Sequence, residues 1–311
     1  KLFLQTGGPI RNQSKEADPG AALEAIVARK LISLELINPT TRCIQKQDQD
    51  TAAISRLDPA LKQKFEKAGM LIAKLILKRF IVDDSFCIDR TDDRDDSVED
   101  IVLFNELQRF NFSIKHNNDS IKHNRPFSLI SNAMGFEEGG TEDQDHRNRL
   151  IKVCDDFRSN NSNVSKFSDL EINTKENLYF ELITECKISL DKYSSNPIAA
   201  QNLFNFIVGK DYIKIKVLTN KKDNDISVIY EDFREGFIQP NGIEKVEIYK
   251  GSRKADKAAS WNLRVEFDNK YIFTHRIHNG GSAISHKNQS QLNMKFDVKF
   301  DSNSKRGSEL T

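Results

Sequence analysis

Residues 99–115, EDIVLFNELQRFNFSIK, decide how the chain is expected to fold. The acidic pair at the start is followed by four apolar residues, which predict a short strand. After a short turn-like segment, Phe110, Phe112 and Ile114 alternate with polar residues, the pattern of a half-buried strand. The stretch therefore predicts a β-hairpin over residues 100–115.

On either side of this hairpin, helical patterns dominate the first two thirds of the chain and strand patterns the last third. Apolar residues at helical spacing predict helices at 17–36, 57–80, 150–157, 176–190 and 199–207. Runs of β-branched and aromatic residues predict strands at 212–217, 227–230, 246–249, 263–267, 271–274 and 292–296, with a hairpin turn at Asp268-Asn269. The expected fold class is α/β (α+β). Residues 1–208 are expected to form a core with helical elements, and residues 209–311 a β-rich part packed on it as one unit.

The composition suits a globular protein of the cytoplasm. The chain has 311 residues, of which 38% are hydrophobic and 30% charged. No run approaches the roughly 18 apolar residues of a membrane helix, and the opening residues contain no apolar segment of a secretory signal. The four cysteines contain no CxxC pair, which argues against a zinc site and a disulfide framework; they are Cys43, Cys87, Cys154 and Cys186.

Charge is distributed unevenly although the formal net charge is only +1. Residues 83–100 contain nine acids and two arginines, whereas residues 242–311 contain thirteen Lys/Arg and eight acids. Gathered acids can hold a metal ion, and cations elsewhere can hold phosphates. An acidic solvated loop and a mildly basic surface would give the same distribution, so charge alone identifies no function.

The predicted hairpin carries residues suited to phosphodiester hydrolysis, which requires a divalent cation and an activated water. In nucleases of the PD-(D/E)xK class, an Asp at the start of one strand binds the metal, and an x-K pair lies on the next strand. Asp100 begins the first strand here, and Ser113 and Lys115 share one face of the second. A serine hydroxyl is a poor Mg²⁺ ligand, so another acid is needed; Glu24 on the first helix is the leading candidate and Glu99 the second.

A longer stretch around this pair resembles a known family. FSIKHNNDSIKHNRP (112–126) is similar to the active-site signature of HaeIII-type restriction endonucleases, S-x-K-N-N-H followed by K-H-x-R, although His116 and Asp119 depart from it. LFNFIVGKDYIKI (203–215) looks like that family's G-x-D-F-Y-K segment. THRIHNGGS (274–282) and QLNMKFDVKF (291–300) resemble its F-R-I-H-N…L-K-F-D block.

This resemblance implies a type II restriction endonuclease that uses Mg²⁺ to cut within a short double-stranded DNA site, and the family is associated with a GGCC-like target. It implies a PD-(D/E)xK core of a mixed β-sheet flanked by helices, in which serine at position 113 is normal. A homodimer and a cognate DNA methyltransferase are the expected partners. The residues expected to contact DNA are Asn117, Asn118, Lys122, His123, Arg125, Arg276, His278 and Asn279.

Several alternatives stay open. A nuclease of the same core could select forks, flaps or nicks in repair or recombination, and a DNA-binding module could keep a degenerate S-x-K without catalysis. His123 and Arg125 could cap a helix, and His278 could belong to a polar network between strands. A second E-x-K match at 185–187 lies in a helical pattern, where residues two apart do not share a face, and is expected to be structural.

Overall fold

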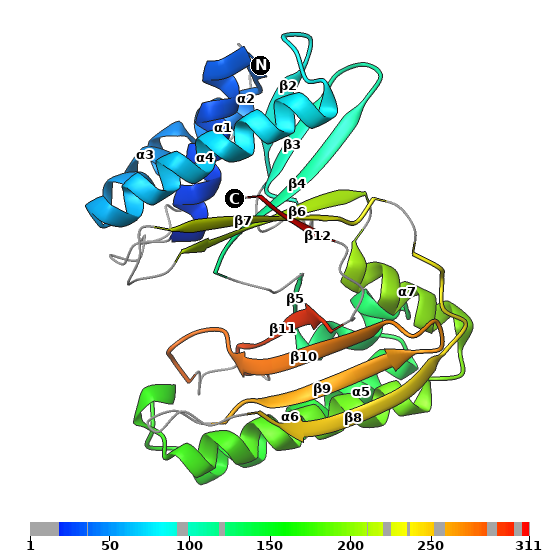
Figure 1. Cartoon of the computed structure of the whole chain (residues 1–311). Coiled ribbons are helices and arrows are strands. Elements are labelled where there is room, and N and C mark those ends of the chain that lie inside the picture. Colours follow the sequence, from blue (N-terminus) through cyan, green and yellow to red (C-terminus); the bar gives the residue numbers. More distant parts are fainter. Residues whose placement is uncertain are drawn as a thin grey trace, which may run out of the picture.

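The computed structural model describes residues 19–35, 37–91, 99–117, 122–209, 211–219, 225–234, 237–251, 259–284, 291–301 and 307–310. They form a mixed α+β fold with two β-sheets, which confirms the coarse fold class (Figure 1). In Figure 1 the blue and cyan helices lie with one sheet in the upper half, and the green helices lie with the orange strands in the lower half. None of the helices in the described part is long and apolar enough to cross a membrane.

The upper sheet, sheet A, has the strand order β1-β2-β3-β4-β6-β7-β12. The pairs β1–β2 and β4–β6 are parallel, and the other neighbours are antiparallel. Its strands are β1 (Asn38–Pro39), β2 (Cys87–Arg90), β3 (Ile101–Phe104), β4 (Arg109–His116), β6 (Tyr212–Thr219), β7 (Ile226–Asp232) and β12 (Gly307–Leu310). The predicted hairpin is β3–β4, in which Ile101 lies opposite Phe112.

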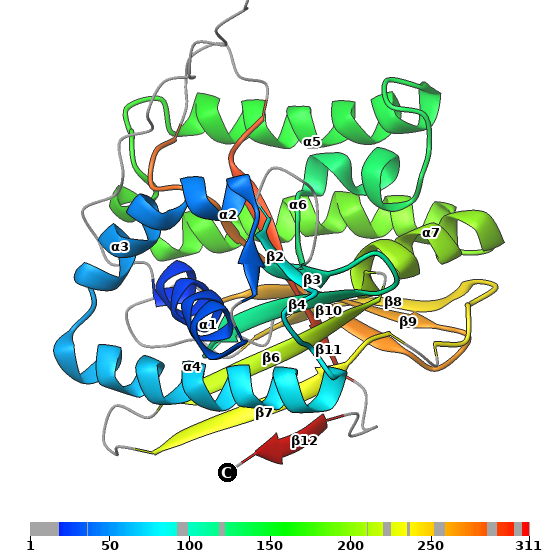
Figure 2. The same cartoon turned by 90° about the horizontal axis from the view of Figure 1, so that it is seen from above.

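Four helices accompany sheet A: α1 (Pro19–Glu35), α2 (Thr41–Gln45), α3 (Gln47–Ser55) and α4 (Pro59–Phe80). Helix α4 begins at Pro59 because Asp58 caps it, accepting hydrogen bonds from the backbone N–H groups of Ala60 and Leu61. The apolar sides of α1 and α4 are buried in one cluster with Phe112 and Ile114 of β4. Seen from above, α4 runs along β6 and β7 (Figure 2).

Helices α1 and α4 approach each other closely at Gly69. A Cβ atom at this position would lie 2.7 Å from Cγ2 of Ile26, which is closer than ordinary van der Waals contact. A glycine is therefore needed where the two helices cross, and it allows α1 to settle against the sheet. The position of α1 also fixes the position of Glu24, which lies on this helix.

The lower sheet, sheet B, is antiparallel throughout, in the order β5-β11-β10-β9-β8. Its strands are β5 (Lys122–Asn124), β8 (Ile243–Lys250), β9 (Trp261–Phe267), β10 (Ile272–Asn279) and β11 (Met294–Phe300). The helices grouped with it are α5 (Thr141–Asn160), α6 (Ile172–Lys192) and α7 (Pro197–Val208), with the short turns η1 (Pro126–Ser128), η2 (Leu129–Ala133) and η3 (Phe167–Asp169). The predicted turn at Asp268-Asn269 joins β9 to β10, and Lys270 there has a positive φ of 67°.

The two hydrophobic clusters divide the chain differently from the expected boundary at 208/209. One cluster joins α1 and α4 to strands of sheet A, including β6 and β7 from the expected C-terminal part. The other joins α5, α6 and α7, from the expected core, to sheet B. Apolar periodicity predicts that a segment is a helix or a strand but not which sheet it joins, so the grouping could not be obtained from the pattern.

Candidate active site

The β3–β4 hairpin places three of the predicted catalytic side chains at one point. Asp100 directly precedes β3, and its backbone N–H donates to the carbonyl of Phe112, 2.7 Å away on β4. Ser113 and Lys115 lie on β4 with Ile114 between them, whose side chain is buried in the cluster under α1 and α4. The alternation of side chains along a strand therefore turns the serine and the lysine to the same face.

The Asp100 carboxylate is the acceptor for all three neighbouring groups. Its Oδ2 accepts from the backbone N–H of Ile114 at 2.6 Å, from Nζ of Lys115 at 3.1 Å and from Oγ of Ser113 at 3.2 Å. The side chains of Asp100 and Lys115 are 18% and 22% exposed. The carboxylate and the amine thus meet on the same side of the sheet, and solvent reaches both.

Helix α1 brings Glu24 to this cluster. Burial raises the pKa of Glu24, and the negative charge of Asp100 raises it further, whereas the cations Arg90 and Lys115 lower it. The net pKa is about 8. Since Asp100 and Glu24 repel each other in a poorly solvated place, a cation between them would relieve that repulsion.

Glu99 has a different neighbour. Its carboxylate lies 3.9 Å from Nη2 of Arg109, and its backbone carbonyl accepts from the Thr91 hydroxyl. Of the two acids considered as replacements for the missing acid at position 113, Glu24 is the one in electrostatic contact with Asp100 and Lys115.

Two charged residues at the site were missed in the sequence. Arg90, at the end of β2, donates from Nη2 to Oε2 of Glu24 at 3.0 Å and from Nη1 to Asp50 of α3. Lys214 on β6 lies beside Ser113 in the parallel register, with its Nζ 3.3 Å from Glu231. Arg90 could have been noticed in the sequence as an arginine within an acidic stretch. Lys214 could not, because no local sequence pattern predicts that β6 pairs with β4.

The donor set fits a magnesium ion. Within the described ranges, no group of three or more His, Cys, Asp or Glu side chains converges as a ready-made metal cage. Mg²⁺ does not need one, because it keeps several waters and binds proteins through one or two carboxylates. Asp100 and Glu24 supply two carboxylates, and the Ser113 hydroxyl lies beside them.

The residues expected to contact DNA after β4 fall into three groups. Asn117, with a positive φ of 49°, closes the end of the β4–β6 pair: its amide bonds to the Thr219 backbone and to Nε2 of His116. Asn118 and the side chains of Lys122 and His123 lie outside the described residues. Arg125 is exposed, and its guanidinium has no ion pair with any residue that the structure describes.

The second set, on β10, forms a polar network around Asp297 of β11. Arg276 is ion-paired with Asp297, and Nε2 of His278 lies 3.1 Å from its Oδ1. Asn279 accepts from the Tyr179 hydroxyl at 3.1 Å and donates to the carbonyl of Gly281 at 2.7 Å. The polar network weighed for His278 is therefore present, and it also includes Arg276.

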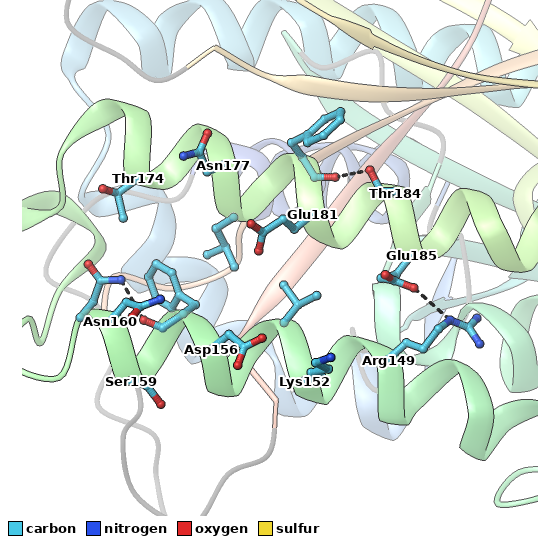
Figure 3. Close-up of a pocket in the computed structure, with 15 residues that line it drawn as sticks. Arg149, Lys152, Asp156, Ser159, Asn160, Thr174, Asn177, Glu181, Thr184 and Glu185 are labelled. Carbon is cyan, nitrogen blue, oxygen red and sulfur yellow. Dashed lines mark hydrogen bonds and ion pairs between the residues drawn. The ribbon is translucent and has the colours of Figure 1, made fainter.

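A large groove lies elsewhere, between α5 and α6, with a volume of about 960 Å³ (Figure 3). None of the predicted site residues lines it, but Glu185 of the second E-x-K match, which was expected to be structural, does. Figure 3 shows Glu185 turned to Arg149, whose Nε lies 2.9 Å away, and Lys187 is paired with Asp191 along the same helix. The helical placement of 185–187 is confirmed, and the groove is distant in the chain from the Asp100 cluster.

No family model, no curated protein and no solved structure matches the chain. The resemblance to HaeIII-type enzymes thus remains a prediction from the quoted motifs. The geometry of the Asp100 cluster stands independently of it.

Proposed function

We propose that the protein is a magnesium-dependent endonuclease of the type II restriction-enzyme kind, which cuts within a short site in double-stranded DNA. The observation that carries the proposal is the meeting of Asp100 and Lys115 from adjacent strands, with Nζ of the lysine 3.1 Å from Oδ2 of the aspartate and with Glu24 in electrostatic interaction with both. A carboxylate that could hold a metal ion, next to a lysine that could offset charge on the phosphate, is suited to phosphodiester hydrolysis.

The proposal includes a PD-(D/E)xK core. Support for it comes from sheet A, a mixed sheet in which the Asp100 strand β3 is next to the Ser113–Lys115 strand β4, and β4 is followed by the parallel strand β6. Helix α1 packs against β4 and contributes the second acid. In the proposal, these positions would supply the metal ligands and the lysine of the class.

Each side chain has a role in the proposed reaction. Asp100 and Glu24 would hold the magnesium ion, which supplies positive charge against the phosphate and lowers the pKa of a bound water. The Lys115 amine would donate hydrogen bonds that orient the attacking water and offset charge on the phosphate. The Ser113 hydroxyl donates to Asp100 and so keeps that carboxylate turned toward the site.

The proposed partner is duplex DNA, with Arg125 as the clearest phosphate contact because its exposed cation is not neutralised by a described residue. A homodimer would match a palindromic site. A cognate DNA methyltransferase and a cytoplasmic location belong to the same proposal.

The test is a Mg²⁺ titration on supercoiled plasmid with the wild type, Lys115→Ala and Lys187→Ala. Lys187, from the second E-x-K match, is the matched control because it is ion-paired with Asp191 of its own helix and belongs to none of the proposed catalytic groups. We expect cutting by the wild type and the control and a loss of at least about 100-fold in Lys115→Ala. Equal cutting by Lys115→Ala would refute the assignment.

The fragment ends distinguish the remaining functions. A restriction enzyme gives discrete fragments that end at one short motif, and sequencing them reads the site. Cutting confined to forks, flaps or nicks would identify a repair or recombination nuclease instead. A DNA gel shift that does not depend on magnesium, without strand breaks in any metal, would identify a binding module.

A further inference from the structure

Arg90 occupies a buried position between two carboxylates that come from different helices. Its side chain is 4% exposed, and its guanidinium donates to Glu24 of α1 and to Asp50 of α3. The Asp50 side chain is 12% exposed and that of Glu24 is 20% exposed. Strand β2 thus inserts a cation where α1 and α3 meet.

The two carboxylates that Arg90 joins, Asp50 and Glu24, have different surroundings. Asp50 lies on α3, a helix that packs against α1. Helix α3 carries none of the proposed catalytic groups. Glu24 accepts from Arg90 and interacts electrostatically with Asp100 and Lys115. Since a guanidinium is a rigid planar fork, a carboxylate held on one side fixes the direction of its other N–H groups.

We propose that Arg90, anchored by Asp50, is a positioning residue that holds the Glu24 carboxylate toward Asp100 and thereby sets the affinity of the magnesium site. The inference rests on the proposed function for the identity of the ion. It assigns to Arg90 and Asp50 no contact with substrate. Outer partners of this kind orient metal ligands, and their loss commonly weakens metal binding by about 10–100-fold.

The neighbouring pair Arg42–Asp89 provides a matched control. Asp89 directly precedes Arg90 on β2, and it accepts from the Arg42 guanidinium and from the Thr40 hydroxyl of the α2 cap. This ion pair joins β2 to a helix as the Arg90 bridge does, but it contains no proposed metal ligand. Breaking it tests the effect of a lost β2 ion pair alone.

The experiment measures Mg²⁺ affinity by calorimetry without DNA, using full-length wild type, Asp50→Asn, Glu24→Gln, the double variant and Arg42→Ala. Asp50→Asn keeps the shape of the side chain and is chosen because removal of the buried Arg90 itself could unfold the protein. We expect it to weaken Mg²⁺ binding about ten-fold in the wild type and less than about two-fold in the Glu24→Gln background. Arg42→Ala should bind Mg²⁺ as the wild type does.

Three results would overturn the inference: an unchanged Mg²⁺ affinity in Asp50→Asn, an equal loss in both backgrounds, or wild-type Mg²⁺ binding that Glu24→Gln does not weaken. Failure of the proposed function looks different. If the expected pattern of affinities is found but no variant or wild type cuts DNA under any condition, the positioning role of Arg90 stands and the nuclease assignment falls.

Discussion

The two polar clusters of the molecule balance their charges in different ways. On sheet A, Asp100 and Glu24 are close enough for repulsion to contribute to the raised pKa of Glu24. On sheet B, Asp297 is neutralised by Arg276 and contacted by His278 within the sheet itself. Each sheet A acid also has a cation beside it, Lys115 for Asp100 and Arg90 for Glu24, yet the pKa of Glu24 is still raised. A perturbed pKa of this kind is typical of a functional site, whereas the ion pairs of Asp297 stabilise the fold.

The largest expected effect is on the rate of DNA cutting, which should depend on the sheet A cluster and not on the sheet B cluster. Asp100→Asn removes the charge that would hold the metal, and we expect DNA cutting to fall about 1,000-fold. Asp297→Asn removes an equivalent charge from the other cluster and should change cutting less than about three-fold. Single-turnover cleavage of a mapped site measures both rates. Comparable losses in the two variants would show that the sheet B cluster also belongs to the site.

The second effect is the acid sensitivity of the sheet B region. His275 on β10 is fully buried, and burial lowers its pKa from 6.5 to about 4. Between pH 6.5 and 4, His275 is therefore protonated in the unfolded chain but stays neutral in the folded protein. The free energy of unfolding falls as the pH is lowered through this interval, by up to about 3 kcal/mol. His275→Leu should flatten this dependence in urea unfolding measured between pH 4 and 7. An unchanged slope would contradict the assignment to His275.

The third effect has the opposite sign and belongs to sheet A. The pKa of Glu24 is raised to about 8, so the folded protein keeps a proton that the unfolded chain releases above about 4.5, and stability is lost as the pH rises through this interval. Glu24→Gln mimics the protonated form and should raise the free energy of unfolding at pH 8 by about 2 kcal/mol in metal-free protein. Urea unfolding in the presence of EDTA measures it. Destabilisation by Glu24→Gln would show that the Arg90 pair outweighs the repulsion.

The smallest effect compares two arginines as DNA contacts. Arg125 is exposed and has no ion pair among the described residues, whereas Arg276 is already paired with Asp297. Arg125→Ala should therefore lower the slope of log affinity against log salt by about one, and Arg276→Ala by less. Fluorescence anisotropy with labelled duplex in Ca²⁺ would give both slopes. A larger change for Arg276→Ala would mean that DNA displaces Asp297 from it.

Local patterns allowed much of the fold to be predicted. The hairpin of residues 100–115 is present as β3–β4, and the predicted helices correspond to α1, α4, α5, α6 and α7. Helix α5 begins at Thr141, before the expected start at residue 150, because its polar first turns give no apolar spacing. Helices α2 and α3 are short, and strand β2 was hidden in an acidic segment.

Most of the site residues that could be predicted are close in sequence, and Glu24 was predicted because the hairpin needed another acid. Asp100, Ser113 and Lys115 belong to one hairpin, whose register follows from alternation. Arg90 and Asp50 join the cluster through the packing of β2 and α3, and Lys214 through a parallel pairing across a long insertion. Such contacts depend on tertiary structure, which periodicity in a single sequence does not encode.

The parallel pairing of β4 with β6 also constrains how the chain is made. Strand β4 ends at His116 and its neighbour β6 begins at Tyr212, so the whole helical part grouped with sheet B is synthesised between them. At ordinary ribosomal speeds, one edge of β4 stays unpaired for roughly 5–20 seconds. During that interval the growing chain presents an open strand edge to its neighbours, a feature that favours aggregation before synthesis is complete.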